Sequence, residues 1–121
     1  MSLQFKKANV NDIPRIYDLA VQIWNDHYLP IIGKEQIDYM LSKMYSADAQ
    51  KDQMQNGQDF YLIVENEKQI GYFAISKTEN EYMLHKLYLL TNEHRKGRGS
   101  ETLKYIESLC MTGNSIKLTV N

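Results

Sequence analysis

The sequence predicts one α/β (α+β) domain with a mixed, mainly antiparallel central sheet and helices on both of its faces. Apolar residues recur at three- and four-residue steps before residue 56 and again in residues 100–111, as in amphipathic helices. Residues 60–90 instead hold three runs rich in aromatic and β-branched side chains, separated by polar turns. The 121 residues, of which 43% are hydrophobic, suffice for one modest core. Residues 1–121 are therefore expected to form a single domain.

The N-terminal part is predicted to be a strand followed by a long helix. Residues 3–8 alternate apolar and polar side chains, as a short strand does. Asn11 and Asp12 supply a helix cap and Pro14 suits a first turn, so a helix is expected from there to near Pro30. Its apolar stripe consists of Ile13, Ile16, Tyr17, Ala20, Ile23, Trp24 and His27.

Two further helices are predicted before the sheet resumes. Residues 34–45 repeat the helical spacing of apolar side chains. Ser46 is placed to cap a shorter, polar helical segment through Gln55, and Gly57 is placed to end it.

The second half is predicted to be a meander followed by a crossover. Residues 60–64 and 70–75 form a hairpin, and residues 82–90 add a third antiparallel strand. A helix over residues 100–111 and a strand over 116–120 then complete a parallel strand, helix, strand unit.

The segment with the clearest chemistry is His94-Arg95-Lys96-Gly97-Arg98-Gly99-Ser100, between the third meander strand and the last helix. Backbone N–H groups at a helix start lack partners within the helix, and the helix dipole makes that end partly positive, so it suits phosphate. The two glycines let the backbone approach a ligand, and the cationic side chains add charge-assisted contacts. The alternative is an ordinary basic turn at the start of a helix.

Two familiar phosphate loops do not fit this segment. A P-loop needs a lysine followed by serine or threonine after its second glycine, whereas Gly99 is followed by Ser100 and Glu101. A dinucleotide fingerprint needs a third glycine where Thr102 stands.

The spacing from His94 through Gly97 to Gly99 resembles the pyrophosphate loop of the GNAT superfamily of acetyl-CoA-dependent N-acetyltransferases, which is Arg or Gln, two residues, glycine, one residue, then glycine or alanine. The strand before it and the order of elements along the whole chain are also similar to that family. His94 replaces the usual Arg or Gln, Arg98 stands where an apolar residue is more common, and Ser100 replaces a frequent alanine. Residues 23–28 together with residues 36–41 further resemble a group of bacterial members without a well-defined substrate.

The resemblance implies an N-acetyltransferase that takes the acetyl group from acetyl-CoA and transfers it to a primary amine of a small molecule or peptide. It assigns coenzyme binding to Leu89, Leu90, His94, Arg95, Lys96, Gly97, Arg98, Gly99 and Ser100. Family members continue with a helix and two more strands, so the resemblance implies a domain incomplete at its C-terminus. The missing helix often carries the tyrosine that protonates the leaving thiolate. The rival function is therefore a non-catalytic or impaired CoA-binding protein.

His85 is the candidate general base. An amine has a solution pKa of about 10.4 and must lose a proton before it attacks, and a histidine pKa of roughly 6.5 suits proton transfer near neutrality. Strand alternation predicts that His85 lies on the face opposite Lys86. The resemblance further implies that a backbone N–H near Leu89, at a strand bulge, stabilises the oxyanion. The alternative for His85 is a half-buried sheet histidine with a satisfied hydrogen bond.

The acceptor site is predicted to include Trp24 and Tyr28, which cluster with His27 at the end of the first long helix. The alternative is that this stripe only packs in the core. Glu79 and Glu81 either attract a cationic acceptor or are simply solvated.

Composition restricts partners and location. The formal net charge of −1 disfavours nucleic acid, and no apolar run is long enough for a membrane span. Cys110 is the one cysteine and the N-terminus lacks a signal peptide, which together predict a cytoplasmic protein. The three histidines lack metal-ligand spacing, so no metal is predicted. A homodimer through the exposed C-terminal strand is expected, because an unpaired strand edge recruits another chain.

Overall fold

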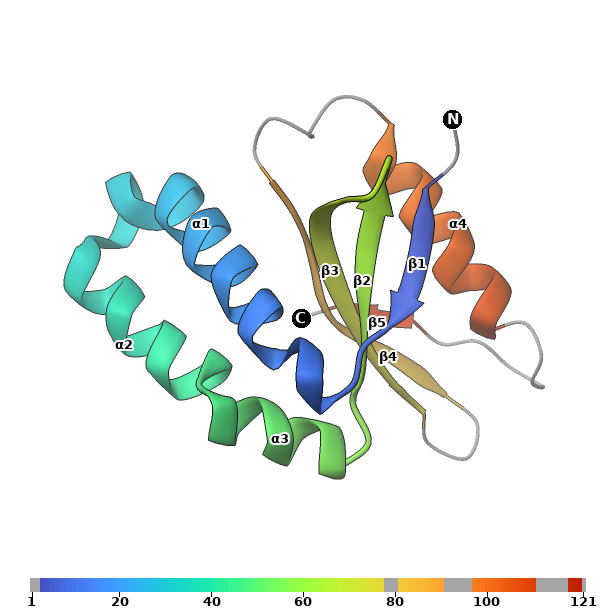
Figure 1. Ribbon diagram of the computed structural model, residues 1–121, viewed down its shortest axis with the longest axis horizontal. Helices are drawn as coiled ribbons and strands as arrows, with labels where there is room; N and C mark the ends of the chain where they lie inside the picture. The colour runs from blue at the N-terminus through green and yellow to red at the C-terminus, as the bar shows by residue number, and fades with distance from the viewer. Residues whose placement is uncertain (1–2, 78–80, 91–96, 111–117, 121) are drawn as a thin grey trace.

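The computed structural model describes residues 3–77, 81–90, 97–110 and 118–120 (Figure 1). A five-stranded sheet in the order β1-β2-β3-β4-β5 forms its centre, antiparallel throughout except for the parallel pair β4 and β5. The elements are β1 (Gln4–Lys7), the 3-10 turn η1 (Val10–Asp12), α1 (Ile13–Ile32), α2 (Lys34–Tyr45), α3 (Ala47–Gln55), β2 (Asp59–Glu65), β3 (Lys68–Lys77), β4 (Tyr82–Leu89), α4 (Arg98–Cys110) and β5 (Leu118–Val120).

Helices cover both faces of the sheet, as predicted. On the face we call the α1 face, α1 and α2 pack over β2 and β3, with Ile23, Leu41 and Tyr72 in one buried cluster. On the opposite face, the α4 face, Ile106 of α4 packs with Phe73 and other strand residues in a second cluster. Figure 1 shows α1, α2 and α3 on one side of the strands and α4 on the other. The mixed α/β architecture is therefore confirmed.

Helix α1 runs past the proline that was expected to end it. Pro30 lies inside α1, which continues to Ile32. A proline removes its own N–H, and so close to the C-terminus this removes a bond from only the last turn. The Gly33 N–H donates to the Leu29 carbonyl (3.1 Å), and Gly33, with a φ of 84°, ends the helix.

Side-chain capping shapes the turns around the first helices. Asn9, rather than Asn11, provides the first cap: its side chain accepts from the Asn11 N–H, and Asp12 accepts from the Asn9 N–H. The predicted short helix over residues 47–55 is confirmed, with Ser46 accepting from the Ala49 N–H at 3.2 Å.

Strand β5 pairs with only the first part of β4. Residues 118–120 lie opposite residues 82–84 in parallel register, with α4 as the crossover. The sequence predicted this unit, although residues 116–117 and the turn at 112–114 lie outside the described residues. From residue 85 on, no described strand pairs with this side of β4. A dimer through β5 stays a prediction.

Candidate active site

Strand β4 carries a bulge at His85. Ala74 of β3 lies opposite Lys86, whereas the next residue, Ile75, lies opposite Leu84, so His85 is an extra residue without a partner in the β3 register. The bulge expected near Leu89 is not present in this pairing, which is regular from Leu89 to Lys86. A bulge redirects the side chain that it carries, and its position cannot be found from alternation alone.

The prediction that His85 faces away from Lys86 is wrong because of this bulge. His85 Nε2 lies 2.7 Å from Ser76 Oγ. Ser76 alternates with Ala74, which packs on the α1 face. Lys86 points to the same face, where its Nζ lies over the Phe60 ring. His85 and Lys86 are therefore neighbours in one environment.

A cavity of about 360 Å³ lies along the edge of β4 that β5 leaves unpaired. It extends from the α1 face, where Tyr28 contributes, to the α4 face, where Leu103 contributes. Its described lining is Tyr28, Leu84, His85, Lys86, Leu87, Tyr88 and Leu103. A smaller cavity of about 140 Å³ shares Tyr28, Leu87 and Tyr88 and adds His27 and Leu89. A molecule at this edge can therefore be reached from both faces of the sheet.

The backbone of β4 directs amides toward this cavity. The Leu90 N–H donates to the Ile70 carbonyl (2.8 Å), so residues 70 and 90 form a hydrogen-bonded pair. Antiparallel pairs alternate, and the amides of Leu87 and Leu89 accordingly point away from β3. Gly71 permits the tight approach of these strands, because a Cβ there would lie 2.2 Å from the Tyr88 carbonyl oxygen.

The predicted acceptor residues are placed differently from one another. Tyr28 lines both cavities. Trp24 packs in the core on the α1 face, with its ring centroid 4.8 Å from that of Tyr28, and is not among the described lining of either cavity. Tyr88, which the sequence analysis did not select, also lines both, and burial raises its pKa to about 12. In the sequence, Tyr88 is one of several aromatic residues in a predicted strand, and no signal distinguishes it as a site residue.

Lys86 was also missed by the sequence analysis. The residue is only 6% exposed, and its Nζ donates to Gln53 Oε1 (3.0 Å) and Gln58 Oε1 (2.9 Å). Burial lowers the pKa of Lys86 to about 8. The amide oxygens satisfy the ammonium without neutralising it, so the charge remains costly at neutral pH.

This buried lysine predicts that stability rises with pH. The pKa of Lys86 is lower in the folded state, about 8, than its ordinary 10.5, so the unfolded state binds more protons between these values. The free energy of unfolding should rise by about 2 kcal/mol from pH 7 to pH 9.5. Urea unfolding at a series of pH values measures the rise. Lys86→Met should remove it, and Lys51→Met, at an exposed position of α3, should retain it. Parallel curves for the parent and Lys86→Met would contradict the assignment.

His85 is kept in its neutral form by the same surroundings. Burial lowers the pKa of His85 from its ordinary value of 6.5, and the charge of Lys86 lowers it further. Near neutral pH the ring therefore has a lone pair that can accept a proton. Its bond to Ser76 also fits the alternative role of a satisfied sheet histidine.

The start of α4 carries the glycine segment. Gly97 has a φ of 76°, and a Cβ there would meet no atom of the described residues within 4 Å. Gly99 lies against Leu89, because a Cβ on it would come within 4.0 Å of the Leu89 side chain. The helix begins with a bond from the Glu101 N–H to the Gly97 carbonyl (3.0 Å). The helix start thus lies beside the strand that lines the cavity. His94, Arg95 and Lys96 lie outside the described residues.

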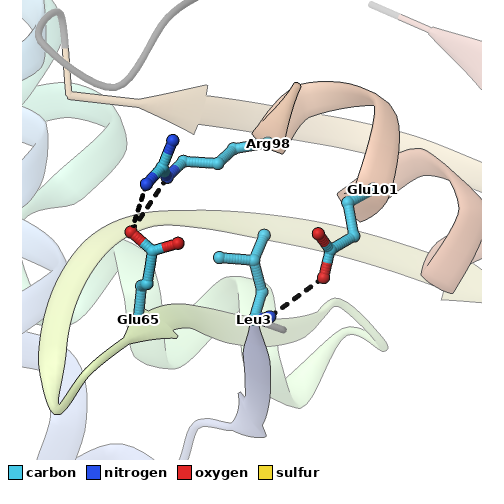
Figure 2. Close-up of polar contacts among 4 residues, drawn as sticks. All are labelled: Leu3, Glu65, Arg98 and Glu101. Atoms are coloured by element: carbon cyan, nitrogen blue, oxygen red, sulfur yellow. Dashed lines mark hydrogen bonds and ion pairs between the residues drawn. The ribbon is translucent and has the colours of Figure 1, made fainter. Parts of the chain in front are cut away.

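The side chain of Arg98 points to the sheet. Figure 2 shows its guanidinium paired with the carboxylate of Glu65, the last residue of β2. The same figure shows the Glu101 carboxylate accepting a hydrogen bond from the backbone N–H of Leu3. The backbone N–H of Arg98 still belongs to the helix start. Ser100 is exposed there.

Among the described residues there is no group of three or more His, Cys, Asp or Glu residues that could hold a metal ion. Of the described helices, none is both long and apolar enough to cross a membrane.

The described residues combine a mixed sheet, in which no described strand pairs with one side of β4 beyond residue 84, with a helix that starts with glycines, as expected for the family that the sequence resembles. Residues 28–121 match the family model described as acetyltransferase (GNAT) domain, which is well over half of the chain. The chain belongs to the GNAT acetyltransferase family. Among curated proteins, none matches the chain.

Solved structures of low sequence identity share the fold. An N-acetyltransferase, PaiA, from Thermoplasma acidophilum in complex with coenzyme A is 21% identical, with a TM-score of 0.80 over 93% of this chain and 74% of that one. A GCN5-related N-acetyltransferase from Rhodopseudomonas palustris is 13% identical, with a TM-score of 0.79 over 100% of this chain and 73% of that one. An aminoglycoside acetyltransferase from an uncultured soil metagenomic sample, in complex with sisomicin, is 14% identical, with a TM-score of 0.62 over 98% of this chain and 76% of that one.

Proposed function

We propose that this chain binds acetyl-CoA at the start of α4 and along β4, and transfers the acetyl group to a primary amine of a small molecule or peptide. The observation that carries the proposal is the cavity of about 360 Å³ at the edge of β4 that no described strand pairs beyond residue 84, which combines lining from both faces of the sheet. The thioester would approach from the α4 face and the amine from the α1 face, so that they meet beside His85.

The diphosphate is proposed to bind the amides of residues 97–100, assisted by the cations of His94, Arg95 and Lys96. Two features of Gly97 support this: it has no side chain to block a ligand, and a Cβ there would meet none of the described residues within 4 Å. Leu89 and Leu90 extend the site along the strand. Leu89 lies against Gly99, which makes the diphosphate site continuous with the cavity.

In the proposed reaction, His85 accepts a proton from the acceptor ammonium, and the neutral nitrogen attacks the thioester carbonyl. A C–N bond forms and the C–S bond breaks; the nitrogen gives up its second proton as the amide forms, the thiolate takes up one proton to leave as CoA thiol, and His85 releases its proton to solvent. A backbone amide of β4 near Leu89 is proposed to stabilise the oxyanion, as hydrogen-bond donors do in acyl transfer, and the Leu87 amide, which points away from β3, is the candidate. Tyr28 and Tyr88 border the acceptor side, with Trp24 supporting Tyr28 from the core.

Calorimetric titration with acetyl-CoA, paired with a thiol-release assay on a panel of primary amines, tests the proposal. Saturable binding with amine-dependent thiol release supports the enzyme. Binding without thiol release for any amine supports the rival CoA-binding protein instead. No heat with either CoA or acetyl-CoA would reject both.

The remaining partners are proposed from composition. The net charge of −1 disfavours nucleic acid as the target of the basic segment. The cytoplasm is the proposed location, and β5, at the sheet edge, is the proposed contact in a homodimer.

A further inference from the structure

The first turn of α4 is fastened to the sheet by two polar contacts that bridge distant parts of the chain (Figure 2). Arg98 Nε donates to Glu65 Oε1 at 3.0 Å, and a terminal nitrogen of the same guanidinium donates to the same oxygen. One turn along, Glu101 Oε2 accepts from the Leu3 N–H at 2.9 Å. The helix start is thereby attached to the end of β2 and to the residue before β1.

The pair of Arg98 and Glu65 is largely shielded from water. Both side chains are only 17% exposed. A ligand phosphate that captured Arg98 would leave the Glu65 carboxylate unpaired in this environment, and breaking one partner from a shielded ion pair is strongly unfavourable. The same carboxylate would then repel the phosphate. The pair is therefore expected to stay intact when an anion binds.

The backbone at the start of α4 is intrinsically flexible, so these contacts are needed to order it. Gly97 immediately precedes α4 and has a positive φ, and Gly99 lies within its first turn, so this turn has unusual conformational freedom. The first amides of a helix also lack carbonyl partners within it. A ligand that uses these amides binds more tightly if they are already ordered.

We propose that Arg98 is a positioning residue of the coenzyme site: it remains on Glu65 and, with Glu101, holds the first turn of α4 so that the amides of residues 97–100 are preorganised for a diphosphate. This rests on the proposed function for the identity of the ligand. The diphosphate charge is then met by the backbone amides and by cations other than Arg98.

Glu65→Gln separates this proposal from direct phosphate contact by the sign of its effect. If Arg98 positions the turn, losing the carboxylate loosens it, and the dissociation constant for CoA should rise about tenfold. If Arg98 is instead a phosphate ligand, the released guanidinium leaves CoA affinity unchanged or makes it tighter, which would overturn the proposal. Asp38→Asn is the matched control, because Asp38 forms an exposed ion pair with Lys34 on α2.

Hydrogen exchange in the CoA-free protein gives a second measurement that needs no ligand. Glu65→Gln and Arg98→Gln should both speed amide exchange at residues 99–103, and Asp38→Asn should not. Unchanged exchange in both variants would overturn the proposal. If the parent binds no CoA, the proposed function fails, while the exchange rates still decide whether the pair orders the turn.

Discussion

Gly97→Glu is expected to weaken CoA binding by at least about 100-fold. Gly97 has a φ of 76°, a conformation that costs other residues roughly 1–2 kcal/mol. The new carboxylate would project from the helix start at which a diphosphate is proposed to bind. Two like charges about 5 Å apart repel by roughly 3 kcal/mol at an effective dielectric of 20, which alone accounts for a factor of about 100. The substitution therefore acts on the backbone and on the charge at once.

The matched control for this prediction is Gly57→Glu. Gly57 follows α3 with a φ of 99°, and a Cβ there also meets none of the described residues within 4 Å, so the backbone strain and the added charge are alike. Both variants should lower the melting temperature by similar amounts, whereas only Gly97→Glu should lose the thermal stabilisation that CoA gives. Titration calorimetry measures both affinities. If Gly97→Glu bound CoA within threefold of the parent, the diphosphate site would lie elsewhere.

The sequence predicted those parts of the molecule that depend on neighbouring residues. Ser46 caps α3 because its hydroxyl reaches an amide three residues further along the chain. The spacing of Gly97 and Gly99 at a helix start likewise depends only on nearby residues and can be recognised in the sequence. The order of strands followed from short polar turns and from one helical crossover, since such connections leave few topologies. The family and the mixed fold could therefore be predicted from the sequence.

The errors arose where the conformation depends on residues far along the chain. One extra residue in the pairing of β4 with β3 turned His85 to the face of Lys86, and periodicity alone places no bulge. The side-chain partner of Arg98 could not be predicted for the same reason, and the assignment of Arg98 to phosphate stays a prediction. Its contact, Glu65, is 33 positions away on another strand. The burial of the Lys86 charge could not be predicted, because its hydrogen-bond acceptors, Gln53 and Gln58, come close to it only in the folded chain.

His85→Gln is expected to lower the rate of acetyl transfer by about 10²- to 10⁴-fold, the usual contribution of a general base. Glutamine keeps a polar group near Ser76 but has no side-chain group that titrates in this range. The affinity for acetyl-CoA should remain within about threefold, because the diphosphate is proposed to bind at the start of α4. Steady-state rates with a saturating amine, together with calorimetric titration of acetyl-CoA and the melting temperature, measure the effect. A loss of acetyl-CoA affinity as large as the loss of rate would indicate a structural role for His85 instead.

The pH profile decides whether His85 acts as the base. Burial and the charge of Lys86 lower the pKa of His85 below 6.5, so the ring is the free base above that pH and becomes protonated only as the pH falls through the lowered value. In the parent, kcat/KM should therefore fall in the acid range with an acidic limb centred below pH 6.5. Titration of the amine substrate itself contributes a separate pH dependence. His85→Gln should lack this limb while keeping the amine dependence. Ser76→Ala, which removes the one described hydrogen-bond partner of the ring, should keep the limb at a shifted pH. An acidic limb that stays at the same pH in both variants would show that another group takes the proton from the amine.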